Sequence, residues 1–445
     1  MALLTSAPRG TQDVLPSDSY KWQYVEKIVS EEAKIFGYRE IRTPTFEHTE
    51  LFNRAVGDTT DVVQKEMYTF KDKGDRSITL KPEGTAGTVR ALVEHGLLND
   101  ALPLKTFYVI PCFRYEKPQA GRLREFHQFG VEAFGSANPL IDAETIGVAR
   151  SILTRLGIKN LSLEINSIGC PTCRAKYHEA LHNYFASKED QLCDTCKGRL
   201  QKNPMRILDC KNPPCKEIAK DAPKMLNYLC DDCSAHFEGV KKALDASGIE
   251  YVINPTIVRG LDYYTRTVFE FLSNDIGSQA AVCAGGRYDG LVEEIGGKPL
   301  PALGFGMGLE RLIMVMEKNG CEFEPEIPCD IYVGSMGENA AIEAFKLVSR
   351  LRQDFGVHAE CDLVGRSVKA QMKYANKIGA RFSMILGDNE LAQKKVVVKN
   401  MSSGEGKELE MTDDFVGELA DYMAYEQLYT TLDDMEGLDE ILKQH

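Results

Sequence analysis

The chain has 445 residues, of which 43% are apolar, so it is long enough for two or three domains with substantial buried cores. No apolar run approaches the roughly 18 residues of a membrane span, and the first residues lack the charged start and apolar stretch of a secretory signal. We therefore expect a cytosolic protein without a membrane partner.

The net charge of −13 argues at first against a nucleic-acid partner, but the acidic residues are unevenly distributed. Residues 401–445 hold 13 acidic and 2 basic side chains, whereas residues 341–400 hold 11 basic and 6 acidic ones. Affinity for a phosphate backbone depends on local lysine and arginine, not on whole-chain charge. The segment 341–400 therefore remains compatible with nucleic-acid binding. The acidic tail either aids solubility or repels nucleic acid.

The first predicted element is an amphipathic helix over 18–36, with Ser17 or Asp18 as its cap. Gly37 breaks the pattern, and a strand-like run then extends to Pro44. Taken alone, this pattern is that of an ordinary helix–strand unit.

A β-hairpin is predicted over 104–134, with its turn at KPQAGRL. Because side chains alternate along a strand, Gln128, Gly130 and Glu132 share one face of the returning strand. Gly130 has no side chain, so it leaves room for a ligand between two polar groups that are costly to bury without partners. A solvent-facing sheet surface is the alternative, but two phenylalanines lie on the same face. The hairpin therefore predicts a binding site.

The chain changes character over 170–254, where eight cysteines form four pairs within 64 residues. Three pairs have C-x-x-C spacing, which lets one backbone turn present two thiolates to a tetrahedral ion. A reducing cytosol disfavours disulfides. The pairs predict one or two Cys₄ zinc sites, with an iron–sulfur cluster or unliganded thiols as alternatives, and their spacing does not decide how they combine. The cysteines are Cys170 and Cys173, Cys193 and Cys196, Cys210 and Cys215, and Cys230 and Cys233.

Strands are expected to resume near Val258, and a glycine-rich turn opens a helix at 308–318. Pro325 and Pro328 mark a linker. From Asp330 onward, alternating strand and helix patterns predict a small α/β domain.

One helix of this domain, predicted over 366–378, carries basic residues at spacings of three, four and four, which form a continuous cationic stripe. The stripe is either a solvated face or a nucleic-acid contact, and the local excess of positive charge favours the second interpretation. Its residues are Arg366, Lys369, Lys373 and Lys377.

Two segments carry a specific resemblance: residues 259–272 read RGLDYYTRTVFEFL, and residues 284–291 read AGGRYDGL. They resemble the two signature segments of histidyl-tRNA synthetases. The chain is also similar, in order, to the three motifs of class II synthetases. These are the helix, strand and proline of motif 1, FRYE at 113–116 in motif 2, and ALGFGMGLERLIMVM at 302–316 in motif 3. The resemblance covers residues 9 to about 425.

The resemblance implies an α+β protein whose catalytic domain is an antiparallel sheet flanked by helices. It also implies ligation of L-histidine to tRNA(His) through histidyl-adenylate. ATP, accompanied by Mg²⁺, is the implied nucleotide substrate, and pyrophosphate is a product. Motif 1 forms a dimer interface in the family, so a homodimer is expected. The implied parts are residues 1–169 with motifs 1 and 2, a helical, Cys-rich insertion at 170–254, residues 255–325 with the histidine-specific segments and motif 3, an anticodon-binding domain at 330–425, and an acidic tail at 426–445.

For histidine, the resemblance implies that Glu83 takes the α-ammonium group. A carboxylate is the natural partner of an ammonium ion, although Glu83 would also suit the first turn of a helix. Glu132 and Tyr264 are expected to hold the imidazole by both ring nitrogens, so that analogues without N–H groups leave them unpaired. The implied histidine-binding residues are Glu83, Gly84, Thr85, Arg114, Gln128, Glu132, Arg259, Tyr263 and Tyr264.

For ATP, the resemblance implies that Arg114 binds the α-phosphate, because a guanidinium stays charged and presents a planar fork of donors. Arg259 is expected between the histidine carboxylate and that phosphate, where a fixed cation aligns two anions and stabilises the developing charge. These two arginines are the expected catalytic residues. Three glycines of motif 3 would let a flat base approach the backbone. The implied ATP-binding residues are Arg114, Glu116, Arg122 and Arg311.

Two other functions remain open at this point. A catalytically silent regulatory paralogue of histidine biosynthesis would usually lack the C-terminal domain and degrade the signature segments, and this chain keeps both. A metal- or redox-sensing nucleic-acid-binding protein would account for the cysteines but leave the remaining motifs unexplained.

Overall fold

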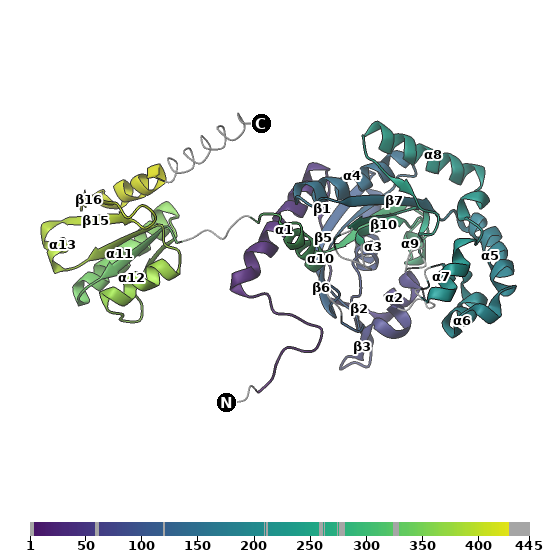
Figure 1. Ribbon diagram of the computed structural model, residues 1–445, viewed down its shortest axis with the longest axis horizontal. Coiled ribbons are helices and arrows are strands. Elements are labelled where there is room, and N and C mark those ends of the chain that lie inside the picture. The colour runs from purple at the N-terminus through teal and green to yellow at the C-terminus, as the bar shows by residue number, and fades with distance from the viewer. Residues whose placement is uncertain are drawn as a thin grey trace. The chain divides into compact units, whose positions relative to one another are not determined.

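The computed structural model describes residues 4–57, 62–118, 121–208, 210, 212–257, 261, 263–273, 275, 281–323 and 329–426. The chain divides into two compact units, Met1–Glu324 and Pro325–His445, which are described separately (Figure 1). Within the described residues, no helix combines the length and apolar character needed to cross a membrane.

An eight-stranded sheet forms the centre of the first unit, in the order β1-β5-β6-β11-β10-β9-β7-β8. Its six central strands are antiparallel to one another, and the short edge strands β1 and β8 pair in parallel with β5 and β7. This order places the hairpin β5–β6 beside β11, whose paired residues lie 168 to 180 positions later in the chain. The strands are β1 (Arg39–Glu40), β5 (Leu104–Phe113), β6 (Glu125–Phe134), β7 (Leu161–Ser167), β8 (Val252–Ile253), β9 (Thr265–Ser273), β10 (Ala281–Arg287) and β11 (Ala302–Gly308).

One face of this sheet is covered by helices (Figure 1). Phe129 and Val131 of β6 are fully buried in this layer. Because strand side chains alternate, Gln128, Gly130 and Glu132 point to the opposite face. The helices that contribute to the layer are α1 (Pro16–Ile35), α4 (Pro139–Arg155), α8 (Asp231–Ala246) and α10 (Leu309–Lys318).

A second core cluster covers the other face, the one that carries Glu132. Phe134 and Val268 of the sheet pack there against Phe52 and Leu92. The elements on this side include a small antiparallel sheet in the order β2-β4-β3. They are α2 (Thr49–Val56), the π-helix Val62–Glu66, α3 (Thr85–Glu94), the 3₁₀ turn Leu97–Asn99, α9 (Leu291–Glu294), β2 (Phe46–His48), β3 (Tyr68–Lys71) and β4 (Ser77–Leu80).

The first helix begins earlier than predicted. Pro16 occupies its first turn after Leu15 at the N-cap, and no side chain caps it, so the prediction of Ser17 or Asp18 as the cap is wrong. Proline suits the first helical position because its missing N–H would have no partner there. Gly37 follows the helix end with φ +81°, a conformation that glycine adopts without strain.

The segment between β7 and β8 is helical. Its helices α5, α6 and α7 gather beside the sheet, and α8 leads back to it (Figure 1). The interior is made of cysteine, tyrosine and aliphatic side chains, including Tyr177 and Leu181, and belongs to the second core cluster. The elements are α5 (Pro171–Ala186), α6 (Asp194–Lys202), α7 (Pro213–Lys220) and the 3₁₀ turns Glu189–Gln191, Pro204–Ile207 and Met225–Tyr228.

The second unit has a five-stranded sheet in the order β13-β12-β14-β15-β16. Strand β12 is parallel to β13 and β14, whereas β15 and β16 are antiparallel additions. Strand β16 was not predicted, because its residues are mostly exposed and polar and lack apolar alternation. The elements are β12 (Ile331–Ser335), α11 (Glu338–Phe355), β13 (Ala359–Cys361), α12 (Val368–Lys377), β14 (Phe382–Leu386), α13 (Asp388–Gln393), β15 (Lys395–Asn400), β16 (Gly406–Glu410) and a helix over 415–426.

Candidate active site

The predicted hairpin is formed by β5 and β6, and its register brings Tyr108 opposite Gly130. A Cβ atom on Gly130 would overlap the Tyr108 ring, and so would one on Gly84. The space predicted for a ligand between Gln128 and Glu132 is therefore occupied by this ring. That part of the prediction is wrong, because alternation along one strand says nothing about a side chain that leans across from its neighbour.

Glu132 is buried, with 1% of its surface exposed. Its carboxylate accepts hydrogen bonds from Thr85 Oγ1 at 2.7 Å, from the Tyr108 hydroxyl at 2.9 Å and from the Tyr288 hydroxyl. Burial raises the pKa of Glu132 to about 8, although these hydrogen bonds act in the opposite direction. Three neutral donors thus hold the Glu132 carboxyl group in position. A ligand that brings an N–H group or a positive charge would favour the ionised form of Glu132.

Three tyrosine rings lie together near this carboxyl group. The ring of Tyr263 is 4.7 Å from that of Tyr264 and 5.5 Å from that of Tyr288, measured between centroids. Tyr263 and Tyr264 were predicted from the sequence, whereas Tyr288 and Tyr108, whose hydroxyls reach Glu132, were not. Signals for both were present, since Tyr288 belongs to the AGGRYDGL segment and Tyr108 faces Gly130 in the hairpin register.

The residues predicted around the amino group also lie together. The Glu83 carboxylate accepts from the backbone N–H groups of Thr85 at 2.6 Å and Ala86 at 2.9 Å, at the start of α3. The N–H of Gly84 donates to Gln128 Oε1 at 3.1 Å. Burial raises the pKa of Glu83, against the effect of its backbone donors. Glu83 therefore stabilises the helix start and still lines an open cavity.

This cavity has a volume of about 320 Å³ and is lined by residues of motif 2, of motif 3 and of both signature segments. A carboxylate and an amide, Glu83 and Gln128, belong to its lining, together with three arginines. Such a lining suits a ligand that carries both an ammonium group and several anionic oxygens. The arginines are Arg114, Arg122 and Arg311.

The arginines are crowded together in a partly buried position. Burial and the nearby Arg122 lower the pKa of Arg114 to about 10, and the same two causes lower the pKa of Arg311. Arg122 forms an ion pair with Glu116, and Arg311 donates to the Ala281 carbonyl at 2.7 Å. Cations held this close to one another favour a polyanionic ligand, which would relieve their repulsion.

The motif 3 glycines make room for side chains of the neighbouring strand β6, and they also contribute to the lining of the cavity. A Cβ atom on Gly304 would overlap the Glu132 carboxylate, and one on Gly306 would overlap the Gln128 amide. Gly306 and Gly308 also line the cavity. The glycines were predicted to admit a flat base, and the structure adds that two of them make room for the polar side chains of β6.

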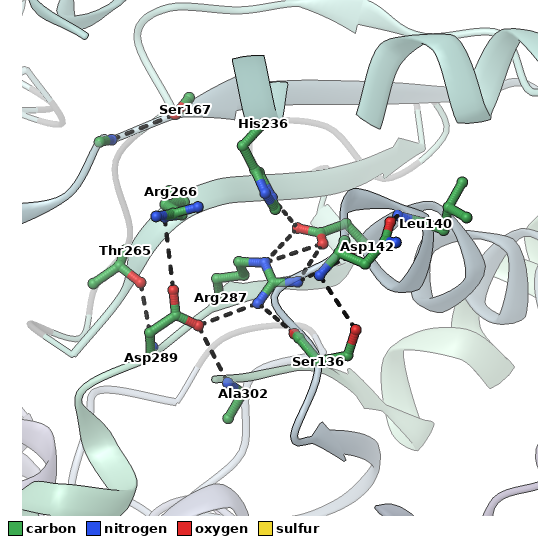
Figure 2. Close-up of polar contacts among 12 residues, drawn as sticks. Ser136, Leu140, Asp142, Ser167, His236, Thr265, Arg266, Arg287, Asp289 and Ala302 are labelled. Atoms are coloured by element: carbon green, nitrogen blue, oxygen red, sulfur yellow. Dashed lines mark hydrogen bonds and ion pairs between the residues drawn. The ribbon is translucent and has the colours of Figure 1, made fainter. Parts of the chain in front are cut away.

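A buried ion-pair network surrounds Arg287, the residue before Tyr288 in the chain (Figure 2). Arg287, which is fully buried, donates to Asp142 Oδ2 at 2.6 Å and to Asp289 Oδ1 at 3.2 Å. His236 of α8 lies 3.2 Å from Asp142 Oδ1. Burial opposes ionisation of Asp142, but His236 and Arg287 outweigh it and lower the pKa of Asp142. Two residues of the network, Arg287 and Asp289, flank Tyr288 in the chain. The network was not predicted from the sequence.

Arg259, the predicted catalytic cation, lies outside the described residues. Leu261, two residues further along, lines the cavity.

The eight cysteines form two groups of four, a pairing that their spacing had left open. Within each group the Sγ atoms all lie within 4.8 Å of one another. Four thiols at this spacing fit the Cys₄ ligand set of structural zinc. The inner cluster is Cys170, Cys173, Cys230 and Cys233, and the outer cluster is Cys193, Cys196, Cys210 and Cys215.

In the second unit, three of the four predicted basic residues lie exposed on α12: Lys369, Lys373 and Lys377. The helix begins at Val368, so the prediction that Arg366 is part of the same helical stripe is wrong. Its guanidinium instead pairs with Asp362 at 2.8 Å and lies 4.2 Å from the centre of the Tyr374 ring.

A mainly antiparallel sheet with an arginine-lined cavity, followed by a five-stranded α/β unit, is the architecture of class II aminoacyl-tRNA synthetases. The family model described as histidyl-tRNA synthetase matches residues 10–312, and the model described as anticodon binding domain matches residues 330–421. The chain therefore belongs to the histidyl-tRNA synthetase family.

Individual relatives agree with this assignment. The chain is 60% identical over 407 residues to Histidine--tRNA ligase of Clostridium novyi, covering 92% of this chain and 97% of that protein. It is 56% identical over 409 residues to Histidine--tRNA ligase of Acetivibrio thermocellus, with coverage of 92% and 98%. The crystal structure of apo S. aureus histidyl-tRNA synthetase matches with a TM-score of 0.80 and 41% identity, covering 94% of this chain and all of that one.

Proposed function

We propose that the protein ligates L-histidine to tRNA(His) in two steps, through histidyl-adenylate formed from ATP with release of pyrophosphate. Relatives named Histidine--tRNA ligase, at 60% and 56% identity over most of the chain, support this activity. The structural observation that carries the proposal is one cavity lined by Glu83 and Gln128 together with three arginines. An amino acid and a nucleoside triphosphate need such complementary groups within reach of one another.

In this proposal, histidine binds at the carboxyl end of the cavity. Glu83 pairs with the α-ammonium, with Gly84, Thr85 and Gln128 alongside. Glu132 accepts an imidazole N–H, and Tyr263 and Tyr264 enclose the ring. A site whose buried polar groups are satisfied only by the correct ligand can reject analogues without N–H groups by about 10⁴–10⁵.

ATP binds at the arginine end, and Mg²⁺ is carried on its phosphates, as is typical of the family. Arg114 takes the α-phosphate, and Arg122 and Arg311 take the other phosphates. Glu116 keeps Arg122 in place through the ion pair seen in this structure. The histidine carboxylate attacks the α-phosphorus, and pyrophosphate leaves as the charge on the phosphoryl oxygens is neutralised.

Arg259 is proposed to bridge the attacking carboxylate and the α-phosphate. Support comes from its position two residues before Leu261, a cavity residue, and four residues before Tyr263. A fixed cation there would bring two mutually repelling anions together and stabilise the transition state more than the bound substrates.

Histidine-dependent ATP–pyrophosphate exchange tests the proposal. The wild-type protein should exchange label only when histidine is present. Arg259→Ala should lower kcat for exchange far more than it weakens histidine binding, measured separately by equilibrium titration. Equal losses in both would contradict the assigned role, and absence of exchange in the wild-type protein would contradict the function itself.

The regulatory-paralogue alternative is not favoured, because residues 330–421 match the anticodon binding domain and the chain is 60% and 56% identical to proteins named as ligases. The metal- or redox-sensing alternative leaves the arginine-lined cavity without a role.

The anticodon-binding unit is proposed to contact tRNA(His) through Lys369, Lys373 and Lys377 on α12. Exposed lysines along one helix suit contacts with phosphate groups. Arg366, which is paired with Asp362, would contribute mainly by positioning the loop before the helix.

We propose a homodimer and a cytosolic location as well. The motif 1 elements α1 and β1 are present, and β1 lies at an edge of the large sheet, where pairing with a second copy is accessible. Eight of the cysteines lie in groups that suit metal binding, and thiolate ligands of this kind are compatible with a reducing compartment. The insertion is proposed to bind structural Zn²⁺ through its cysteine clusters.

A further inference from the structure

We propose that the insertion binds two zinc ions with unequal roles, and that the ion in the inner cluster holds the tyrosine segment of the histidine pocket in place. The outer ion would stabilise only the insertion itself. The part that concerns the pocket rests on the proposed function, whereas the part that concerns metal binding does not.

The distances within both clusters fit tetrahedral zinc. Zn–S bonds of about 2.3 Å place the sulfur atoms of a tetrahedron about 3.8 Å apart. The Sγ atoms of Cys170 and Cys173 are 3.5 Å apart, and those of Cys193 and Cys210 are 3.9 Å apart. In each cluster two cysteines are buried and two are half-buried, so the ligand set is shielded yet reachable by an ion.

Backbone geometry also prepares the inner cluster for thiolates. Cys170 is the N-cap of α5 and Cys230 is the N-cap of α8, and the second cysteine of each pair lies in the first turn. The Cys230 N–H donates to Cys173 Sγ at 3.0 Å. Helix N-termini and N–H donors favour negative charge, which a site with four thiolates must accommodate.

The inner cluster lies where the insertion joins the catalytic sheet. Cys170 follows β7 by three residues, and Cys230 and Cys233 begin α8, which packs against α4 and the core of the sheet. An ion held by these cysteines would tie together the entry and the exit of a segment of about sixty residues. The outer cluster lies on or beside α6 and α7, which are internal to the insertion.

A direct chain of hydrogen bonds links the inner cluster to the tyrosine segment. Arg174, next to Cys173, donates to the Tyr264 carbonyl at 3.1 Å. The N–H of Arg266 donates to the Gly169 carbonyl at 2.9 Å, next to Cys170. Arg266 has φ +48°, which is unfavourable for a residue with a side chain and persists only where its surroundings enforce it. The Gly169 carbonyl, next to Cys170, holds the Arg266 backbone in this conformation through that hydrogen bond.

A second route passes through α8 and the buried ion-pair network (Figure 2). His236, one turn after Cys233, contacts Asp142, which pairs with Arg287. Arg287 pairs in turn with Asp289, whose backbone N–H donates to Thr265 Oγ1 at 3.3 Å. Both routes therefore converge on residues 264–266, directly after Tyr263. Moving the start of α5 or of α8 would disturb the tyrosines around Glu132 from two sides.

Metal content is measured first, on protein purified without chelator, by elemental analysis. The expected content is two zinc ions per wild-type chain and one in each of Cys230→Ser and Cys193→Ser. Cys321→Ser, which changes a half-buried cysteine outside both clusters, should keep two and serves as the matched control. Substoichiometric zinc in the wild-type protein, or iron in its place, would overturn the proposal.

Histidine-dependent exchange then separates the two sites. Loss of the inner ion should raise KM for histidine by about tenfold with little change in KM for ATP. Loss of the outer ion should raise it far less while still lowering the melting temperature. Equal effects of Cys230→Ser and Cys193→Ser on KM for histidine would overturn the unequal roles.

Cys230→His addresses the possibility that Cys230→Ser does not fold. Imidazole can replace a thiolate in a zinc site, so this variant should retain two ions at lower affinity. As a competing chelator removes the weaker ion, KM for histidine should rise in step with the zinc released. A KM that stays constant while the ion leaves would refute the coupling. Absence of exchange in a wild-type protein that holds two ions would refute the proposed function but not the metal sites.

Discussion

The two ends of the candidate site, the Glu132 carboxyl group and the arginines of the cavity, meet the same problem, a buried ionisable group, in opposite ways. At one end, Glu132 is surrounded by neutral donors from Thr85, Tyr108 and Tyr288, and its pKa is raised to about 8. At the other end, Arg114 and Arg311 lie near Arg122, and burial and this neighbouring cation lower their pKa values. At the Glu132 end, hydroxyl groups of the protein already bond the carboxyl group. At the arginine end, positive charges remain close to one another.

The contrast follows from the ligand that each end is proposed to receive. A neutral imidazole brings only N–H donors and acceptors, so selectivity requires a rigid acceptor whose other contacts are already made. A triphosphate brings several negative charges, so the protein gains more from cations that are held close before the ligand arrives. Rigid strands carry the first end, and the loop between β5 and β6 contributes to the second.

The largest expected effect that tests this contrast comes from a change at Glu132. Glu132→Gln keeps the shape but cannot become an anionic acceptor, so KM for histidine in pyrophosphate exchange should rise by about 10²–10³. KM for ATP should change little, because the arginine end is untouched. A comparable rise in both constants would mean that the two ends do not act separately.

Arg114→Lys tests the arginine end. Lysine keeps the charge but loses the planar fork, so kcat for exchange should fall by about 10²-fold. Arg76→Lys is a suitable control, since that side chain is 68% exposed and pairs with Asp72, four residues earlier. Unchanged kcat in Arg114→Lys would show that charge alone is sufficient at this position.

Tyr288→Phe sharpens the description of the carboxyl end, because it removes one of three hydroxyl donors and keeps the ring. Hydrogen bonds to a charged group typically contribute about 1.5–3 kcal/mol, so KM for histidine should rise by about tenfold or more. The loss should also raise the pKa of Glu132 further, because that hydrogen bond acts to lower it. Tyr251→Phe, in a tyrosine next to the edge strand β8 and outside the cavity lining, is the control, and equal effects of the two changes would contradict the assignment.

The smallest expected effect is on stability without ligands. Glu132 has its pKa raised from 4.5 to about 8 in the folded protein, so between these values the folded state binds more protons than the unfolded state. Stability should therefore fall as pH rises through this window, by at most about 1.4 kcal/mol per pH unit from this group. Denaturant titrations of wild type and Glu132→Gln at pH 6 and pH 8 should show a smaller loss in the variant. An identical pH dependence would mean that Glu132 is already ionised.

Much of the fold was predictable because its signals are local. The hairpin over 104–134, the helix after the motif 3 glycines and the alternating pattern after Asp330 all depend on periodicity and glycine position, which short segments carry themselves. The errors have local causes too. Leu15 and Pro16 start α1 without a capping side chain, and β16 lacks apolar alternation.

The candidate site was predicted residue by residue through motifs, yet its internal contacts were not. Glu83, Gln128 and the three arginines do share one cavity. The ring that fills the space at Gly130, the tyrosine hydroxyls on Glu132 and the Arg287 network each join segments far apart in the chain. No spacing rule connects such segments, because the register between strands is set by the packing of the whole sheet.

The sequence by itself determined the family, the order of the motifs and the chemical types of the groups proposed to bind the two substrates, since these depend on residue identity at fixed spacing. It also determined that eight cysteines form four close pairs. Only the tertiary structure decided which pairs meet, which hydroxyls reach Glu132 and which helices carry those contacts toward the tyrosines. Those choices depend on backbone segments brought together by burial of the sheet faces, and burial is a property of the folded chain rather than of any segment within it.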